Sequence, residues 1–464
     1  MAEGFLSRSK SMERLGHHYF EELLSRSFFQ QSTNDEFEYT MHDLMNDLAT
    51  SVAGEFFCRL DGEMDVSDTN EVFEKLGHFS LIASSSGSYR KLKQLQKSTH
   101  VHTFLGISIS GSDYVHDELI HKLQFVRVLA LTGITITEVP ESIGSLKHLR
   151  YLNFSFTEIT CLPEQVSDLY NLQTLLVHHC SELSSLPKSF AKLINLRHLD
   201  ISKTPNLNKM PLGIGGLMSL QTLPKVFIEE EAKDANLHQK KGLDVLKMEW
   251  SDVFDDSRND IIEYEVLTEL RPHPKLKKLK IFNNNGMRFP TWVGNPSFDQ
   301  LTKLTLRGCR STHLPTLGCL DSLRKLVVES MSEVKSVGFE FLAPVSSFIG
   351  IGFPSLEVLK FKDMQGWQRW LINSGDGHET PRSFPCLHEI CIANCPELAE
   401  VSIGLIPSLR VLYIEECSKR VLRSMIGLSS SLVRLKMLNV KALSQLHGED
   451  LMHLGALEHL YQEL

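Results

Sequence analysis

One short phrase recurs through most of the chain: an apolar residue, two variable residues, an apolar residue, one variable residue and a third apolar residue. Leu149–Phe154 is a clear copy. The first positions of the copies are Val126, Leu149, Leu172, Leu196, Leu220, Leu243, Leu276, Leu301, Leu323, Leu356, Leu387, Leu409, Leu432 and Leu457. These anchors follow one another at spacings of 22 to 33 residues. Such self-similarity predicts a repeat architecture and limits the possible folds more than any other feature.

Within each copy the apolar residues alternate with variable ones, which is typical of a short strand with one buried face. A single copy cannot bury that face, whereas stacked copies form a continuous core. This phrase at a period of roughly 20–29 residues is a leucine-rich repeat. The sequence therefore predicts an α/β fold: a leucine-rich-repeat solenoid with a parallel sheet on its concave face and an irregular convex side. The longer spacings are interpreted as surface loops.

Residues after the strands predict how each repeat turns. Early copies carry an apolar–proline pair, such as Val139–Pro140, and proline there stops a strand ladder and favours short turns and irregular helix. A small or polar residue is expected at the turn itself, for which the candidates are Cys180, Cys309, Cys395, Cys417, Asn284, Thr157 and Thr204. The pair Cys391 and Cys395 could form half of a metal site, but no matching pair has zinc-like spacing. We therefore interpret the thiols as buried and reduced, and predict no metal site.

Composition restricts the classes of partner. The chain has 464 residues, 42% of them hydrophobic, and a net charge of −9, which disfavours a general nucleic-acid binder. Its first ten residues lack the apolar core of a signal peptide, and no run approaches the roughly 20 apolar residues of a membrane span. Nine cysteines, an odd number, favour a reducing compartment. A cytoplasmic location is expected, with the nucleus as a second possible location.

Residues 1–60 do not follow the repeat. Apolar residues within 18–31 and within 43–53 have helical spacing, and Leu44, Met45, Leu48 and Val52 lie on one side of the second predicted helix. A short alternation at 37–41 separates the two, which suits a small winged-helix region. The predicted organisation is a partial winged-helix region at 1–60, a linker with an N-terminal cap or degenerate repeats at 61–125, and about 14 repeats at 126–464.

Several stretches resemble one family in content and in order. Met41–Ala49 resembles the MHD motif that ends the nucleotide-binding region of plant NB-LRR disease-resistance proteins, and Met1–Leu6 and Phe20–Gln30 resemble the preceding winged helix. Leu146–Leu152 and Leu169–Leu175 are similar to early repeats of its coiled-coil branch. The resemblance implies a C-terminal fragment (the end of the ARC2-like region plus the repeats) of an intracellular immune receptor. It also implies a role in defence: a recognition or autoregulatory module that senses a pathogen effector or a guarded host protein.

The same resemblance implies that His42 descends from a residue that contacts the phosphates of ADP. The alternative is a histidine packed at a helix start, with Asp43 as the N-cap. The chain contains no GxxxxGK[ST] phosphate loop, and the glycine-rich stretch Gly213–Gly216 lacks the lysine. We therefore expect no cofactor in this chain, although the full-length family uses ADP and ATP.

Variable positions of the strand phrase are expected to face the concave side. In the copies anchored at 276, 301, 323 and 356 they are rich in basic residues: Lys278, Lys280, Lys303, Arg307, Lys325, Lys360 and Lys362. The alternatives are a solvated lysine face and a binding face. The binding hypothesis predicts a protein partner with an acidic surface: an effector, a guarded host protein or the receptor's own nucleotide-binding region. Nucleic acid is not expected, because aromatic residues are not interleaved.

Two other functions fit the sequence less well. A generic leucine-rich-repeat adaptor, such as a ubiquitin-ligase substrate receptor, would need an F-box-like segment at the N-terminus, and residues 1–50 fit a winged helix better. An enzyme would need a nucleophile and base in a recognisable arrangement, and the sequence offers none. An acidic stretch is expected to be a flexible charged loop; it comprises Glu229–Glu231, Asp252, Asp255, Asp256, Asp260, Glu263 and Glu265.

Overall fold

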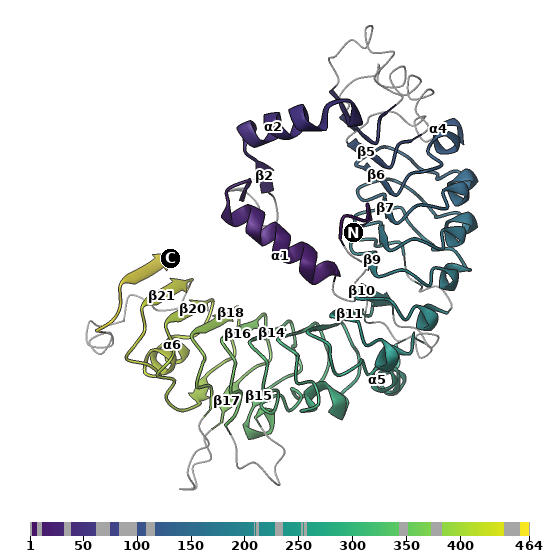
Figure 1. Cartoon of the computed structure of the whole chain (residues 1–464). Coiled ribbons are helices and arrows are strands. Elements are labelled where there is room, and N and C mark those ends of the chain that lie inside the picture. Colours follow the sequence, from purple (N-terminus) through teal and green to yellow (C-terminus); the bar gives the residue numbers. More distant parts are fainter. Residues whose placement is uncertain are drawn as a thin grey trace. The chain divides into compact units, whose positions relative to one another are not determined.

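The computed structural model describes most of the chain and divides into two compact units, Met1–Ser219 and Leu220–Leu464 (Figure 1). The described residues are 2–6, 12–31, 39–61, 75–82, 100–107, 117–207, 209, 213–227, 235–251, 254, 258–342, 351–372, 383–439 and 455–463. Each unit contains its own run of parallel strands.

The first unit opens with helix α1 (Met12–Ser25), the antiparallel pair β1 (Phe29–Gln31) and β2 (Tyr39–Met41), helix α2 (Asp43–Ala53) and the short turn η1 (Gly54–Phe56). The second predicted helix is confirmed. The first ends earlier than expected, because Ser27 adopts a φ of 60° and the following residues pair with β2 instead. The Phe20 ring stabilises this arrangement by packing 4.8 Å from the Tyr39 ring.

A parallel sheet follows in the first unit, and each strand pairs with the next. Its strands are β3 (Phe57–Asp61), β4 (His78–Ile82), β5 (Thr103–Ile107), β6 (Val128–Thr132), β7 (Tyr151–Asn153), β8 (Thr174–Leu176) and β9 (His198–Asp200). Helix α4 (Asp117–Lys122) precedes β6, and the turns η3 (Glu141–Ser145), η4 (Glu164–Asp168), η5 (Phe190–Lys192) and η6 (Ile214–Gly216) follow β6 to β9. Strands β4 and β5 lie in the segment expected to hold a linker and degenerate repeats.

The second unit continues the pattern with a second parallel sheet. Its strands are β10 (Thr222–Phe227), β11 (Val245–Glu249), β12 (Lys278–Phe282), β13 (Lys303–Arg307), β14 (Lys325–Glu329), β16 (Val358–Lys362), β18 (Glu389–Ala393), β20 (Val411–Glu415), β21 (Arg434–Leu438) and β22 (His459–Glu463). A smaller parallel sheet contains β15 (Ser336–Val337), β17 (Arg369–Leu371) and β19 (Glu400–Ser402). Figure 1 shows β15 and β17 on the other side of this unit from β14 and β16.

The remaining elements of the second unit are short. They are helices α5 (Asp260–Glu269) and α6 (Lys419–Ile426), and turns η8 (Leu237–Gln239), η9 (Thr291–Gly294) and η10 (Phe339–Phe341). The prolines Pro140, Pro163 and Pro290 each directly precede a 3₁₀ turn, because proline fixes φ there and no N–H is required of it. The predicted leucine-rich-repeat fold, with a parallel sheet and irregular turns opposite it, is confirmed.

Side chains of the repeated phrase form the core. In the copy at Leu149, the residues Leu149, Leu152 and Phe154 are all fully buried. A residue in the left-handed region follows many strands, such as Phe156 with a φ of 62°, and it turns the chain towards a buried side chain. Thr157 is that buried side chain, and its hydroxyl donates to the Phe154 carbonyl at 2.7 Å. All seven predicted turn residues are buried, because each lies at the turn after its strand and points into the core between stacked repeats.

Part of the acidic stretch is a helix and not a flexible loop, which corrects that expectation for Asp260, Glu263 and Glu265. Asn259 caps α5 by accepting from the Ile261 and Ile262 backbone N–H groups. The Arg258 guanidinium donates two bonds of 2.7 Å to the Glu263 carboxylate, and this ion pair fixes the helix against the repeats. Residues Asp252, Asp255, Asp256 and Glu229–Glu231 lie outside the described part of the chain.

Candidate functional site

The predicted basic residues all lie on the open face of the second unit's sheet. Burial alternates along β12, so Leu279 and Ile281 are buried while Lys278, Lys280 and Phe282 face outward. Neighbouring strands pair in phase, which places Lys278 beside Lys303 and Lys303 beside Lys325. These three lysines are called the lysine row below. Lys360, Lys362 and Arg307 lie on the same face, since β16 and β13 pair in the same register.

The lysine side chains perturb one another. Burial lowers the pKa of Lys303, and the charges of Lys325, Lys280, Lys278 and Lys360 lower it further. Burial likewise lowers the pKa of Lys280, with further lowering by Lys247 and Lys278. Like charges on neighbouring strands are destabilising. An anion placed over the row would therefore relieve repulsion as well as gain attraction.

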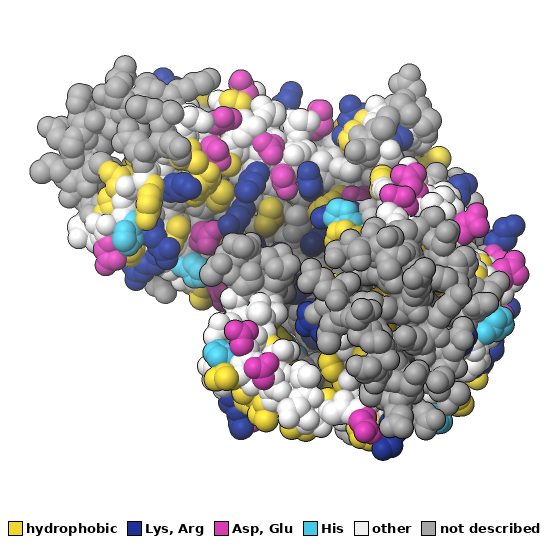
Figure 2. Space-filling model, turned by 90° about the horizontal axis from the view of Figure 1, so that it is seen from above, with side chains coloured by type: hydrophobic (Ala, Val, Ile, Leu, Met, Phe, Trp, Pro, Cys, Tyr) yellow, Lys and Arg dark blue, Asp and Glu magenta, His cyan; other side chains and the backbone are white. Residues whose placement is uncertain are grey.

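Two of the predicted residues are partly neutralised. The Lys360 ammonium lies 2.5 Å from the Glu389 carboxylate, and the Arg307 Nε lies 3.9 Å from the Glu329 carboxylate. By contrast, the lysine row, Lys280 and Lys362 form no ion pair with any described residue. Figure 2 shows dark blue basic side chains gathered on one surface, with magenta acidic ones beside them. The lysine row, together with Lys280 and Lys362, therefore supplies the cations of this face that remain available to a partner.

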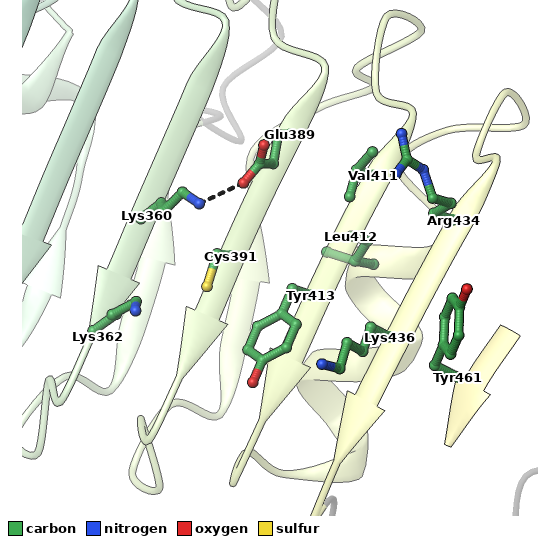
Figure 3. Close-up of a pocket in the computed structure, with 10 residues that line it drawn as sticks. All are labelled: Lys360, Lys362, Glu389, Cys391, Val411, Leu412, Tyr413, Arg434, Lys436 and Tyr461. Atoms are coloured by element: carbon green, nitrogen blue, oxygen red, sulfur yellow. Dashed lines mark ion pairs between the residues drawn. The ribbon is translucent and has the colours of Figure 1, made fainter. Parts of the chain in front are cut away.

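A pocket of about 440 Å³ opens on the same face, further along the sheet (Figure 3). Its lining residues are Lys360, Lys362, Glu389, Cys391, Val411, Leu412, Tyr413, Arg434, Lys436 and Tyr461. The Lys436 ammonium lies 5.4 Å from the centre of the Tyr413 ring, and the Tyr413 hydroxyl donates to Glu415 at 2.6 Å. The pocket therefore combines aromatic surface with an excess of positive charge.

The far side of this pocket is formed by residues that were not among the predicted basic residues. Arg434, Lys436 and Tyr461 occupy the outward positions of the copies anchored at Leu432 and Leu457. The strand rule that identified the lysines would have identified these three residues if it had been extended to the last two anchors. Lys247, on β11, is a further basic residue of the face, and it pairs with Glu249 at 2.9 Å.

Cys391 lies within β18, whereas Cys395 follows the end of that strand. Cys391 faces the pocket, and burial raises the pKa of its thiol to about 11, so it is neutral at physiological pH. Cys395 is fully buried at a repeat turn. Among the described residues, no group of three or more histidine, cysteine or carboxylate side chains is placed to hold a metal ion.

His42 lies at the start of α2, in the first unit. Its Nδ1 accepts a bond of 3.3 Å from the Leu44 backbone N–H, so the N-cap is His42 itself and not Asp43 as the alternative interpretation proposed. The imidazole is exposed, and this bond leaves only Nε2 for an outside contact. His42 therefore offers a single free ring nitrogen at the surface.

A contact that the sequence did not predict joins the N-terminal segment to the repeats within the first unit. The Glu13 carboxylate pairs with Arg197 at 2.8 Å and lies 3.5 Å from the His198 ring. Arg127 donates to the Glu3 carbonyl at 3.1 Å, and Arg150 donates to the Ala2 carbonyl at 3.0 Å. The three arginines occupy one position of the repeat, directly after the anchor, and that periodicity was the available signal.

Among the helices that the structure describes, none is both long and apolar enough to cross a membrane.

Comparison with known proteins agrees with this architecture. Residues 100–403 match the family model "Leucine-rich repeat region", and residues 1–49 match "Disease resistance protein Winged helix domain". The Listeria monocytogenes protein InlJ has a similar fold, with a TM-score of 0.51 at 13% identity, covering 87% of this chain and 72% of that one.

Plant relatives match over nearly the whole chain. A putative disease resistance protein of Arabidopsis thaliana is 37% identical over 457 residues, which cover 89% of this chain and 32% of the relative. Disease resistance RPP13-like protein 1 (putative) of Arabidopsis thaliana is 36% identical, covering 90% and 44%. Disease resistance protein RGA2 of Solanum bulbocastanum is 30% identical, covering 89% and 43%. The chain thus spans a third to under a half of these relatives' lengths, and it belongs to the plant NB-LRR disease-resistance family.

Proposed function

We propose that this chain acts in plant defence as the recognition and autoregulatory module of an intracellular immune receptor. In this proposal it binds, without catalysis, a protein with an acidic surface on the open face of its second unit. The lysine row is the observation that carries the proposal, because three cations in register form no ion pair with any described carboxylate. The partner is an effector, a guarded host protein or the receptor's own nucleotide-binding region.

The chemistry of the face supports a protein partner. Leucine-rich repeats offer extended surfaces whose outward residues vary without disturbing the core. Tyrosine and arginine are the residues that most often dominate the energy of protein interfaces, and the pocket presents Tyr413, Tyr461 and Arg434. The lysine row would then steer and orient the partner, while the pocket would anchor it.

The autoregulatory half of the proposal is supported by the first unit. Contacts of Glu3 and Glu13 hold the N-terminal segment on arginines that precede the repeat strands. Such a contact can restrain the winged-helix part until a partner competes for the repeats. A location inside the cell is supported by the cysteines, since all nine are free thiols.

Charge reversal tests the recognition surface. The variant Lys278→Glu/Lys280→Glu/Lys303→Glu/Lys325→Glu is expected to bind acidic effectors at least about tenfold more weakly, since both attraction and steering are lost. Binding is measured by calorimetry against a panel of purified pathogen effectors that differ in surface charge. The matched control is Lys275→Glu/Lys335→Glu/Arg369→Glu, which changes three exposed cations of the same unit outside the face. Unchanged dissociation constants for the first variant at low salt would remove the proposal.

We further propose that this chain alone binds no nucleotide. His42 is expected to serve only as a helix cap, so calorimetry with ADP and Mg²⁺ should give no stoichiometric signal. His42→Asn retains a capping oxygen and should leave the thermal midpoint unchanged, whereas His42→Ala should lower the stability of α2 by about 1 kcal/mol. A stoichiometric ADP signal that disappears in either variant would contradict this expectation.

A further inference from the structure

The lysine row has a direction and a spacing. Lys278, Lys303 and Lys325 begin three consecutive strands, and each is directly opposite the next. Adjacent strands in a sheet lie about 4.8 Å apart, so the row presents a cation at about that interval along a line across the strands. The row is not continued on either side, where Val245 and Val358 occupy the same position.

We propose that the lysine row binds one acidic face of an α-helix of the partner, whose axis lies across strands β12 to β14. This inference rests on the proposed function and specifies the secondary structure of the partner at that site. The helix would carry Asp or Glu on successive turns, one for each lysine of the row.

Spacing distinguishes a helix from an extended segment. One helical turn advances about 5.4 Å, so across three lysines a helix accumulates a mismatch of only about 1 Å. An extended strand repeats a face every 6.8 Å or so, and its mismatch across the same row is about 4 Å. Lysine side chains can adjust to a mismatch of about 1 Å within their preferred conformations, and this favours a helix over an extended segment.

Neighbouring side chains fit the same orientation. Beside the row, the middle positions of β13 and β14 are the short residues Thr305 and Val327, which allow close approach of a helix. At the far ends of β12 to β14 the outward residues are Phe282, Arg307 and Glu329, and the Arg307 cation lies 3.9 Å from the Glu329 carboxylate. The far ends of these strands therefore offer no second row of free cations, which favours binding of an acidic helix at the end where the lysine row lies.

The titration of Lys303 is consistent with this occupant. Burial and the surrounding lysines lower its pKa in the free protein, and a carboxylate of the helix would raise it again. The complex therefore binds protons more tightly than the free protein, and affinity should fall as pH rises through the pKa of this lysine.

Designed peptides test the proposal on the full chain. The probe is an alanine-rich helical peptide of about 21 residues, long enough to be helical in water, with glutamates three or four residues apart on one face. One control has the same composition with the glutamates distributed around the helix, and another alternates glutamate with threonine to favour an extended strand. Binding is measured at low salt by fluorescence anisotropy, with peptide helicity checked by circular dichroism.

The one-face helix is expected to bind about tenfold more tightly than either control. Lys303→Glu should remove that preference, and a peptide with its central glutamate changed to lysine should restore it. The variants Lys275→Glu and Lys335→Glu should have no effect. Equal binding of all three peptides would overturn the helix while leaving an acidic partner possible, and no binding of any peptide would count against both this inference and the proposed function.

Discussion

Lys240 is a buried cation in a chain whose other described lysines reach the surface. It follows η8, and its side chain is fully buried. Burial lowers its pKa from an ordinary 10.5 to about 8. The unfolded chain therefore holds a proton on this group between pH 8 and 10.5 that the folded chain has released. The free energy of unfolding should therefore rise as the pH rises from 8 to 10.5. Below pH 8 the folded protein carries the full destabilising effect of the buried charge.

The variant Lys240→Met tests whether the buried charge of Lys240 makes the stability of the protein depend on pH. The variant keeps the unbranched shape up to the ε position and removes the charged amino group, so at pH 7.5 it should be more stable than the natural protein by up to about 3 kcal/mol. The difference should shrink towards zero near pH 10, as measured by urea unfolding at both pH values. A difference that does not change with pH would show that Lys240 is not titrating in this window.

At the scale of single elements, α5 illustrates how an insertion is held. The side chains of Arg258 and Glu263 are each only 10% exposed, and the Asn285 backbone N–H also donates to Glu263 at 2.7 Å. Arg258 further donates to the Ser251 and Asn283 carbonyls. The helix is thus attached to the neighbouring repeat by charged hydrogen bonds, because its own hydrophobic contact with the core is limited to few residues.

Removing one partner of the ion pair between Arg258 and Glu263 should destabilise the second unit more than removing both partners. Glu263→Ala leaves a buried guanidinium uncompensated and is expected to destabilise the second unit by about 3 kcal/mol. In Arg258→Met/Glu263→Met much of that loss should be recovered, because no buried charge remains. Thermal unfolding measures both, and additive losses in the double variant would refute the pairing.

The same element shows the limit of local patterns. Apolar spacing at 260–269 is weak and the acidic composition favours a loop, but the Asn259 cap and the ion pair between Arg258 and Glu263 stabilise the helix. Similarly, the spacing at Phe28 extended a predicted helix that in fact ends at Ser25, since pairing of Phe29–Gln31 with Tyr39–Met41 is a non-local interaction.

At the scale of the molecule, the first unit joins residues far apart in the chain. Glu13 and Arg197 are 184 positions apart, and their side chains are 25% and 15% exposed. His198 lies beside them; burial lowers the pKa of its imidazole, Glu13 raises it, and Arg197 lowers it. This cluster fixes the beginning of α1 to the strand face of the first unit.

Charge exchange tests the contact between the N-terminal segment and the repeats. Glu13→Arg should release α1, so that its amide hydrogens exchange several times faster while those of β6 to β9 remain protected. Combining it with Arg197→Glu should restore protection, because the pair is re-formed with the charges exchanged. Equal exchange rates in all three proteins would show that the ion pair does not hold α1.

The sequence by itself determined the repeat, the strand face and the identity of the basic residues on it. Those properties follow from the alternation of apolar and variable residues within each strand and from the recurrence of the phrase about every 23 residues. Both patterns can be read directly from the order of residues in the chain. Only the tertiary structure decided which cations remain available. Lys360 and Arg307 are partly neutralised by Glu389 and Glu329 from adjacent strands, whereas the lysine row faces no described carboxylate. Strand register sets these distances, and charge interactions depend on distance in space, not on separation along the chain.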